Sequence, residues 1–573
     1  MQAITTTKTA TALHISGAEA IIRCLLAEGA DTIFGYPGGA IMPVYDALYD
    51  FREELHHVLT RHEQGAVHMA QGYARASNRV GVCLATSGPG AANLITGIAD
   101  AQIDSTPIVC ITGQVARHLL GTDAFQETDV MGISMPVTKW NFQVTTAEEI
   151  PEAIAKAFYL ARSGRPGPVL VDITKNAQVE KFDFAYTPCT NVRSYVAKPK
   201  IDPEAIASAA AAINEAERPL VIFGQGVTLA AAEEELKQFV EKGNLPAIGT
   251  LLGHSALPTD HTHYAGMPGM HGTYAANKLT NECDVLIAIG MRFDDRVTGN
   301  LEYYAKQAKV IHLELDPAEI DKNVVADIPV LGDCKESMAC IAPLLHPRPR
   351  KPWFGKFKEL DQMEEEKVRQ GELHPTEGAL TMGEVIDKMN QVTQGNAVIV
   401  TDVGQHQMVA WRYGDFKLDK SHITSGGLGT MGFALPAAIG AKLGAEDRQV
   451  IAVIGDGGFQ MTLQELGTIM QTKVPVKILI LNNEFLGMVR QWQQLFFDKR
   501  YSSTEMDNPD FVTIAKGYGI EGQRVTERDK LPEALQTFLS HPDAYLLEVA
   551  VGKENNVFPM VPTGASVSDV RLE

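Results

Sequence analysis

Several features that would assign this chain of 573 residues to a common class are missing. No apolar run approaches the roughly 18 residues that cross a bilayer. The seven cysteines form no C-x-x-C pair, and their odd number fits neither a disulfide framework nor a zinc ribbon. No Gly-x-x-x-x-Gly-Lys-Ser/Thr motif is present, which excludes a P-loop. The cysteine usage favours a reduced, cytoplasmic compartment.

Positive charge is scarce as well. The chain has 50 lysines and arginines against 70 aspartates and glutamates, a net charge of −20. So acidic a surface argues against nucleic-acid and membrane partners. The first dozen residues are rich in Thr and contain neither an acid nor an apolar segment. We expect a short disordered leader there rather than a secretory signal.

A repeated pattern runs along the chain: a short apolar, β-branched run ends in Gly or Asp, and a helical stretch follows. Ten such runs lie at residues 80–86, 107–112, 168–173, 220–223, 285–289, 310–315, 397–403, 449–454, 476–481 and 545–551. Apolar strands that alternate with helices predict parallel sheets covered on both faces. The fold class is therefore α/β, with doubly wound parallel sheets.

Two polar stretches interrupt this pattern. Residues 184–203 contain three prolines, and residues 345–377 begin with a Pro-rich basic segment that continues into a charged run. Both are interpreted as linkers, and residues 364–366 as a solvated helix face. The chain then divides into three α/β domains of about 150 to 175 residues.

The strongest local signal is Gly-Asp-Gly at residues 455–457, followed by a helix at 463–472, a strand and then Asn482-Asn483. One crossover places Asp456 and the Asn pair at the same edge of a parallel sheet. Carboxylate, amide and main-chain oxygens suit Mg²⁺ that shares its shell with phosphate. A helix-capping Asp and a turn-forming Asn pair explain the spacing equally well.

A Gly-x-Gly-x-x-Gly motif at residues 427–432 is a weaker signal. It follows the very short run 421–424 and precedes an apolar helix at 434–443. Taken alone it would suggest a nicotinamide dehydrogenase. Its position behind so short a strand argues against a dinucleotide site.

Taken together, the motifs resemble those of a known family. Gly455-Asp456-Gly457 and Asn482-Asn483 match the thiamine-diphosphate motif. Other matching segments are Phe34-Gly-Tyr-Pro-Gly-Gly39, Arg61-His-Glu-Gln64, Thr86-Ser-Gly-Pro-Gly90, Asp123-Ala-Phe-Gln-Glu127, Ser163-Gly-Arg-Pro-Gly-Pro168, Gly269-Met-His-Gly272, Arg292-Phe-Asp-Asp-Arg296, Gly404-Gln-His-Gln-Met408, Ser425-Gly-Gly-Leu-Gly-Thr-Met431 and Gly487-Met-Val-Arg-Gln-Trp492. From about residue 14 to 565 the chain resembles the catalytic subunit of acetohydroxyacid synthase, also called acetolactate synthase.

The resemblance implies a pyrimidine-binding domain at 14–185, a central FAD-binding domain at 196–345, a diphosphate-binding domain at 375–550 and a C-terminal tail at 551–573. It implies thiamine diphosphate, Mg²⁺ and FAD as cofactors, with FAD not reduced in the main reaction. The family builds its thiamine site between two chains, so a homodimer or homotetramer is expected. A small regulatory subunit is a further expected partner.

The implied activity is decarboxylation of pyruvate and transfer of its two-carbon unit to a second 2-keto acid. Pyruvate as acceptor gives 2-acetolactate, and 2-ketobutyrate gives 2-aceto-2-hydroxybutyrate, both precursors of branched-chain amino acids. A flavin-dependent pyruvate oxidase and a pyruvate decarboxylase share the fold and remain alternatives. A non-catalytic binding subunit is disfavoured because the motif set is intact.

By this resemblance, Glu63 is the carboxylate that hydrogen-bonds the aminopyrimidine of the cofactor, a role that needs a poorly solvated acid able to exchange a proton. Gly38 and Gln126 would lie near the reacting carbon. Mg²⁺ would be held by Asp456, Asn483 and the carbonyl of Phe485. The diphosphate and the bent cofactor would be held by Gln405, His406, Gly429, Met431, Gly457 and Gly458.

The FAD contacts of the family map onto Arg165, Gly224, Thr250, Leu251, Met270, His271, Gly290, Arg292, Asp294, Glu314 and Asp333. The substrate contacts map onto Phe125, Lys175, Arg296, Met488 and Trp492. A guanidinium pairs readily with the carboxylate of a 2-keto acid. An indole wall would favour an ethyl over a methyl group.

Two segments depart from the family pattern. Residues 171–177 read Val-Asp-Ile-Thr-Lys-Asn-Ala, where Leu-Pro-Lys-Asp is usual, and this concerns the substrate tunnel. Residues 252–258 read Leu-Gly-His-Ser-Ala-Leu-Pro, where Gly-Leu-Gly-Ala is commoner, and this concerns the FAD contacts.

Overall fold

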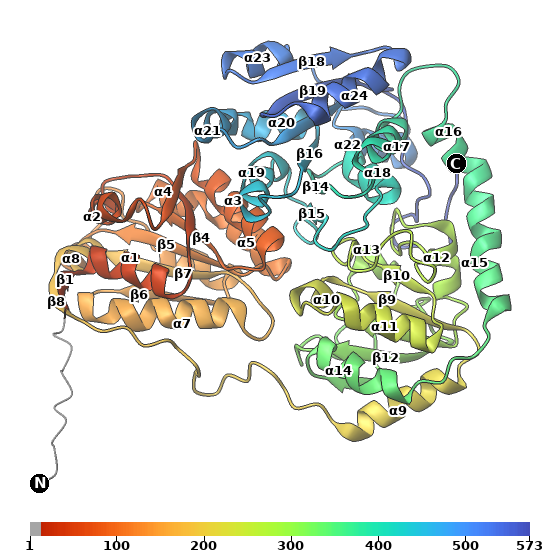
Figure 1. Ribbon diagram of the computed structural model, residues 1–573, viewed down its shortest axis with the longest axis horizontal. Helices are drawn as coiled ribbons and strands as arrows, with labels where there is room; N and C mark the ends of the chain where they lie inside the picture. The colour runs from red at the N-terminus through yellow and green to blue at the C-terminus, as the bar shows by residue number, and fades with distance from the viewer. Residues whose placement is uncertain (1–12) are drawn as a thin grey trace, which may run out of the picture. The chain divides into compact units, whose positions relative to one another are not determined.

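A computed structural model describes residues 13–573 and contains three parallel sheets (Figure 1). The expected leader lies outside the described residues. The chain forms two compact units, of which unit 2 comprises residues 72–78 and 196–573, and unit 1 the rest. All seven cysteines are free thiols. In the described part of the chain, no helix is both long and apolar enough to span a membrane.

Unit 1 contains a six-stranded parallel sheet in the order β3-β2-β4-β5-β7-β6. Helices α1, α2, α7 and α8 pack apolar side chains against one face of it, around residues such as Ile33, Val109 and Val169. The bounds are β2 Thr32–Gly35, β3 His56–Leu59, β4 Gly81–Ala85, β5 Ile108–Gln114, β6 Trp140–Val144, β7 Val169–Thr174, α1 Gly17–Ala27, α2 Met42–Leu48, α3 Glu63–Ser77, α4 Pro89–Asn93, α7 Ile150–Arg162 and α8 Lys175–Val179. A short antiparallel pair, β1 (Leu13–Ser16) with β8 (Lys181–Phe184), joins the two ends of this unit.

Unit 2 contains two parallel sheets. The central sheet has the order β10-β9-β11-β12-β13, and the C-terminal sheet has the order β15-β14-β16-β17-β19-β18. Their strands are β9 Pro219–Phe223, β10 Ala247–Gly249, β11 Val285–Ile289, β12 Lys309–Glu314, β13 Ile328–Leu331, β14 Val398–Thr401, β15 His422–Thr424, β16 Val450–Gly455, β17 Lys477–Asn482, β18 Glu521–Val525 and β19 Tyr545–Ala550. The helices that matter below are α13 Asp295–Thr298, α18 Gln405–Tyr413, α19 Ala434–Gly444, α20 Asp456–Thr462, α21 Leu466–Thr472 and α22 Gly487–Phe496.

The two six-stranded sheets share one topology. In each, the first strand lies between the second and the third, and the sixth lies between the fourth and the fifth. All pairings are parallel, so the carboxyl ends of the strands lie at one edge of each sheet. Side chains that follow these strands therefore gather at that edge, and the site residues are found there.

The ten strands predicted from the sequence are all present, and so is the helix expected at 434–443. The helix predicted at 463–472 is present as a 3-10 turn (Leu463–Glu465) followed by α21, and a further helix that was not predicted, α20, begins at Asp456 directly after β16. An acidic residue in the first turn stabilises a helix through its free N–H groups.

The prediction of a linker at residues 345–377 is wrong over most of that stretch. Helix α15 (Lys351–Glu364) continues through a π-helical turn (Glu365–Arg369) into α16 (Gln370–Leu373). Trp353 and Phe357 are buried against the central sheet. This segment is helical because it has an apolar side to bury, whereas residues 185–202 contain no helix or strand.

The prediction of a solvated helix face at 364–366 is wrong for Glu364, whereas Glu366 is exposed and Glu365 is half-buried. Glu364 is 2% exposed and forms an ion pair with Arg412 of α18. Its other oxygen accepts the backbone N–H of Tyr274. Arg412 and Tyr274, whose contacts compensate for burying the Glu364 carboxylate, lie 48 and 90 residues away in the sequence. A local sequence pattern does not reveal contacts at such separations.

Candidate functional site

Glu63 is the first residue of α3 and follows β3 closely, so it lies at the carboxyl edge of the unit 1 sheet. Asn93, the last residue of α4, donates a hydrogen bond from Nδ2 to Glu63 Oε2 at 3.0 Å. A Cβ atom added to Gly90 would lie 3.3 Å from Glu63 Oε1, so this glycine leaves room for the carboxylate. The half-buried carboxylate is thus bounded on two sides.

The turn that follows β4 contacts the other two predicted catalytic residues. A Cβ on Gly38 would lie 2.5 Å from the Thr86 side chain. A Cβ on Gly88 would lie 2.8 Å from the carbonyl oxygen of Gln126, whose φ of 59° is left-handed. One turn of unit 1 therefore brings Gly38, Glu63 and Gln126 together.

Asp456 and Asn483 lie at the carboxyl ends of the neighbouring strands β16 and β17, as their spacing predicts. Asp456 is 1% exposed, and burial raises the pKa of its carboxyl to about 6. Asn508 Nδ2 donates to Asp456 Oδ2 at 2.7 Å, and the backbone N–H of Asn483 also favours the ionised form. Phe485 donates its backbone N–H to Asn483 Oδ1 at 3.3 Å. This set of oxygens suits a hard cation.

Asn483 belongs to a buried network of side-chain amides. Its Nδ2 donates to Gln405 Oε1 at 3.2 Å. Gln405, at the start of α18, donates from Nε2 to Gln491 Oε1 at 3.0 Å and to the carbonyl of Asn555 at 2.9 Å. Both side-chain protons of Gln405 are therefore used within the protein, which leaves its backbone N–H for an anion.

His406 follows Gln405 and is 5% exposed. Burial lowers the pKa of its imidazole to about 3, so the ring is neutral. A Cβ on Gly404 or Gly455 would lie 2.8 Å from His406 Cε1, so both glycines make room for the ring. In the described residues, His406 Nε2 has no hydrogen-bond partner. A phosphate oxygen would accept a hydrogen bond from this nitrogen once Nε2 carries a proton, which the negative charge of a bound diphosphate would favour.

Asp402, which the sequence analysis did not single out, organises the loop at residues 425–432. It follows β14, is fully buried, and burial raises the pKa of its carboxyl to about 6. Both carboxylate oxygens accept the backbone N–H of Gly432 at 3.0 Å. Gly429 and Gly432 have φ values of 68° and 84°, which glycine adopts without strain. The loop thereby presents Met431 in a defined position.

The two glycines that follow Asp456 allow close approach of the backbone. A Cβ on Gly457 would lie 2.7 Å from Leu486 Cδ2 and 3.8 Å from Met431 Cε. A Cβ on Gly458 would lie 2.9 Å from the carboxyl carbon of Asp402. At Gly457 and Gly458 the first turn of α20 thus exposes its backbone next to Met431, and the N–H groups there favour an anion.

The five strands of the central sheet all end within two residues of a predicted FAD contact. In sheet order these contacts are Thr250, Gly224, Gly290, Glu314 and Asp333. The chain order reverses between β9 and β11, the kind of position where open α/β sheets bind ligands. There, a Cβ on Gly224 would lie 2.5 Å from the carbonyl oxygen of Gly290, so the strand ends approach closely.

The other predicted FAD contacts have varied surroundings. Asp294 caps α13, and burial raises the pKa of its carboxyl while Arg292 opposes the shift. His271 is buried, and in the described residues its Nε2 has no hydrogen-bond partner. The carbonyl of Leu251 lies 3.3 Å from a ring nitrogen of His422. Arg165 belongs to unit 1, where its Nε donates to a serine hydroxyl.

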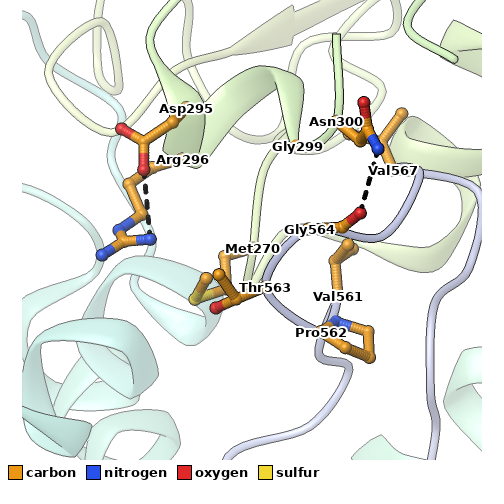
Figure 2. Close-up of a pocket in the computed structure, with 10 residues that line it drawn as sticks. All are labelled: Met270, Asp295, Arg296, Gly299, Asn300, Val561, Pro562, Thr563, Gly564 and Val567. Atoms are coloured by element: carbon orange, nitrogen blue, oxygen red, sulfur yellow. Dashed lines mark hydrogen bonds and ion pairs between the residues drawn. The ribbon is translucent and has the colours of Figure 1, made fainter. Parts of the chain in front are cut away.

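A cavity of about 190 Å³ lies in unit 2 between loops of the central domain and the C-terminal tail (Figure 2). Met270 lines it and donates its backbone N–H to the carbonyl of Arg296 at 2.8 Å. Asn300 Nδ2 donates to the carbonyl of Gly564 in the tail at 3.2 Å. The guanidinium of Arg296 pairs with Asp295 at 3.2 Å and extends away from the tail residues. Met270 and Arg296 therefore meet at the wall of this cavity.

The remaining predicted substrate residues have exposed or half-buried side chains. Phe125 is 88% exposed, and Lys175 at the start of α8 is exposed too. Met488 and Trp492 lie one turn apart on α22, where the indole ring packs 5.3 Å from the ring of Phe496.

Four polar residues at the site escaped the sequence analysis: Asn93, Asp402, Gln491 and Asn508. Asp402 could have been found, because it falls in the apolar run predicted at 397–403. The others contact residues that lie 30, 86 and 52 positions away. No local spacing signals contacts of that range.

Three family models match the chain in sequence. The N-terminal TPP binding domain of thiamine pyrophosphate enzymes matches residues 15–133, their central domain matches 206–341, and their C-terminal TPP binding domain matches 402–549. The three matches contain the candidate residues of the three sheet edges, apart from Arg165 and Lys175.

Curated relatives match almost the entire chain. The acetolactate synthase isozyme 2 large subunit of Escherichia coli is 47% identical over 97% of this chain and 99% of its own length. The acetolactate synthase large subunit of Corynebacterium glutamicum is 46% identical over 97% and 90%. That of Lactococcus lactis is 42% identical over 96% and 95%. The chain therefore belongs to the family of acetolactate synthase large subunits, within the thiamine pyrophosphate enzymes.

Proposed function

We propose that this chain is the catalytic subunit of an acetolactate synthase, which decarboxylates pyruvate and joins the two-carbon unit to a second 2-keto acid. The observation that carries the proposal is the C-terminal sheet edge. There, a buried aspartate with a raised pKa and an oriented asparagine lie beside the unpartnered His406 Nε2. These groups fit a magnesium diphosphate, and near-complete alignment with acetolactate synthases supports the assignment.

The residues divide the binding of thiamine diphosphate and Mg²⁺ between them. Asp456, Asn483 and the carbonyl of Phe485 would bind the metal, and the Asp456 pKa would fall in its presence. His406 Nε2, the backbone N–H of Gln405 and the glycine N–H groups of α20 would bind diphosphate oxygens. Gly429 and Met431 would support the ring system. When bound, thiamine diphosphate supplies a carbanion equivalent and accepts the electrons released by decarboxylation.

Glu63 of unit 1 would hold and exchange the proton on which this chemistry depends. Asn93 keeps one carboxylate oxygen fixed, so the other is left to bind the aminopyrimidine ring. Gly38 and Gln126, beside the same turn, would shape the space around the reacting carbon. A carboxylate in such a slot contributes typically about 10²–10⁴-fold to a proton-transfer step.

FAD would bind at the carboxyl edge of the central sheet. The close strand ends at Gly224 and Gly290 let a dinucleotide approach the backbone, and the buried His271 offers a ring nitrogen that needs a partner. Glu314 ends β12, where an acid suits a ribose hydroxyl. We assign FAD a structural role, without reduction in the main reaction.

Substrate choice would depend on two side chains of unit 2. The exposed guanidinium of Arg296 suits the carboxylate of the acceptor 2-keto acid. Trp492 would offer the apolar wall that favours 2-ketobutyrate over pyruvate, by about 1–3 kcal/mol for one methylene. Met488, Phe125 and Lys175 would complete the pocket and its entrance.

The proposal includes partners and organisation. A homodimer or homotetramer would cover exposed apolar side chains such as Phe125, and a small regulatory subunit would complete the enzyme. The three sheets fall within the domains proposed at 14–185, 196–345 and 375–550. The reduced cysteines suit the cytoplasm.

The test is an oxygen-free reaction of the purified chain with pyruvate, thiamine diphosphate, Mg²⁺ and FAD. We expect acetolactate as the main product, with the flavin absorbance unchanged. Acetate with bleached flavin would replace the proposal by a pyruvate oxidase, and acetaldehyde by a pyruvate decarboxylase. The reaction is run in parallel with an added small subunit, and no product in either case would contradict the function.

A further inference from the structure

We propose that Gln491 and Gln405 are positioning residues that fix the orientation of the Asn483 carboxamide, and that the C-terminal tail sets this orientation through Val557. This inference rests on the proposed function, in which Asn483 binds Mg²⁺ through Oδ1. It concerns how the chain makes that oxygen available.

The carboxamide of Gln491 is oriented by the tail backbone. The two ends of a carboxamide are alike in shape, so its neighbours decide which end carries the oxygen. Val557 donates its backbone N–H to Gln491 Oε1 at 2.8 Å and accepts from Gln491 Nε2 with its carbonyl at 3.1 Å. A backbone N–H only donates and a carbonyl only accepts. Gln491 therefore has one permitted orientation.

This orientation is passed on to Gln405. Gln491 Oε1 faces Gln405 at 3.0 Å, so Gln405 must present its NH₂ group there. The carbonyl of Asn555, 2.9 Å from Gln405 Nε2, makes the same demand independently. The oxygen of Gln405 is thereby directed at Asn483.

The last step orients Asn483. Its carboxamide turns Nδ2 toward Gln405 Oε1, at 3.2 Å, and the backbone N–H of Phe485 donates to Oδ1 at 3.3 Å, so the relay fixes the amide end and Phe485 supports the oxygen end. A reversed amide would offer Mg²⁺ an NH₂ group, which is no metal ligand. The order of donors and acceptors from Val557 to Asn483 thus produces the ligand atom that a hard cation needs.

The three side-chain amides of the relay are shielded from water. Gln491 is fully buried, and Gln405 and Asn483 are 4% exposed, so water does not readily replace a lost partner. A Cβ on Gly487 would lie 2.2 Å from Gln405 Oε1 and 2.6 Å from Asn483 Nδ2. This helix start is therefore glycine because the two amides occupy the space.

Hydrogen bonds to the rest of unit 2 hold the tail backbone around Val557 in place. Val557 and Met560 are buried, and Val561 donates its backbone N–H to the carbonyl of Met270 at 2.8 Å. Gly552 likewise donates to the carbonyl of Leu380 at 2.8 Å. Contacts on both sides of Val557 keep its N–H in place, so the relay begins at a fixed point.

The relay predicts a loss of metal affinity when Gln491 is removed. Groups that orient a metal ligand typically contribute about 10–100-fold to metal affinity. In the full chain with thiamine diphosphate, we expect Gln491→Leu to weaken Mn²⁺ binding about tenfold, measured by the EPR signal of free Mn²⁺. Gln494→Leu, on the same helix and bonded to Arg490, is the matched control and should not change it.

A double-mutant cycle separates orientation from general damage. Asn483→Asp offers an oxygen at both ends and needs no orienting partner, so in that background Gln491→Leu should change Mn²⁺ affinity less than about twofold. Gln491→Met, of similar length, is the second variant should the leucine not fold.

Each outcome bears on one of the two proposals. Equal losses in both backgrounds, or no loss in the single variants, would overturn the relay. A wild-type chain that forms no Mn²⁺ complex with thiamine diphosphate would overturn the proposed function and the relay with it.

Discussion

The two six-stranded sheets have the same strand order but different chemistry at their carboxyl edges. The edge in unit 1 holds Glu63, half-buried and fixed by one asparagine. The edge of the C-terminal sheet holds Asp402 and Asp456, both buried, within a dense set of amides. One strand order thus carries two different sets of polar groups, and the loops after the strands decide which set is present. Fold alone would not have assigned either set.

The largest effect should come from removing the acid of the unit 1 edge. Glu63→Gln keeps the shape and the bond to Asn93 but cannot exchange the proton, so we expect acetolactate formation to fall about 1,000-fold. Steady-state rates and circular dichroism measure activity and folding. The control is Glu53→Gln, at an exposed glutamate of the same unit, and near-normal activity of Glu63→Gln would refute the assignment.

The second effect concerns the proposed Mg²⁺ ligands at the carboxyl edge of the C-terminal sheet. Asp456→Asn removes the charged ligand, and we expect the affinity for Mg²⁺ with thiamine diphosphate to fall about 100-fold. Isothermal titration measures it. The exposed Asp507 provides the control variant, Asp507→Asn. If the Mg²⁺ affinity of Asp456→Asn equals that of wild type, Asp456 is not a ligand of the metal.

The same substitution has a pH signature in the cofactor-free chain. Burial raises the folded-state pKa of Asp456 from 3.8 to about 6, so the folded chain binds the proton more tightly than the unfolded chain does. The stability that this proton contributes is complete below about pH 4 and is lost as the pH rises through about 6. In Asp456→Asn, melting temperature should therefore fall less between about pH 5 and 7 than in wild type; an identical fall would contradict the raised pKa.

A third comparison pairs one buried carboxylate from each sheet. Asp402 accepts backbone N–H groups, whereas Asp172 of β7 accepts from the side chains of Thr112, Gln114 and Gln143. Side-chain donors can turn to accept from a new NH₂ group, but a backbone N–H cannot. We expect Asp402→Asn to destabilise by about 2–3 kcal/mol and Asp172→Asn by about 1 kcal/mol. Melting curves of the two variants measure both losses of stability. A larger loss in Asp172→Asn than in Asp402→Asn would contradict this explanation.

The smallest effect tests the fixing of Glu63. Asn93→Ala removes one hydrogen bond to a carboxylate, and we expect kcat to fall about tenfold with little change in melting temperature. Asn191→Ala, at an exposed asparagine of unit 1, is the control. A kcat equal to that of wild type would mean that the carboxylate needs no such support.

The sequence was informative where a signal repeats locally. Ten apolar strands could be predicted because buried parallel strands are continuous apolar runs. Asp456 and Asn483 could be placed at one edge because a single crossover joins them. Helix α20 could not be predicted, since the Gly-Asp-Gly at its beginning has the composition of a turn.

Contacts between distant segments carried the information that the sequence did not reveal. Gln491 looks like any polar residue on an amphipathic helix, and the three residues to which it hydrogen-bonds lie in α18 and the tail. Glu364 sits in a run of acids that favours water, yet Arg412 lies opposite it in the fold. Such burial depends on tertiary pairing, and one sequence without relatives does not report it.

The buried pair of Glu364 and Arg412 limits how this enzyme can be dissected. The family models match three separate stretches, which invites expression of the last as an independent fragment. A fragment that starts after residue 373 would lack Glu364 and leave the Arg412 guanidinium without its counter-charge. Breaking a buried pair in this way costs about 3–5 kcal/mol, a large part of what holds a typical domain together. A chimaera between relatives should therefore transfer the central and C-terminal sheets together. It should include α15, which carries Glu364.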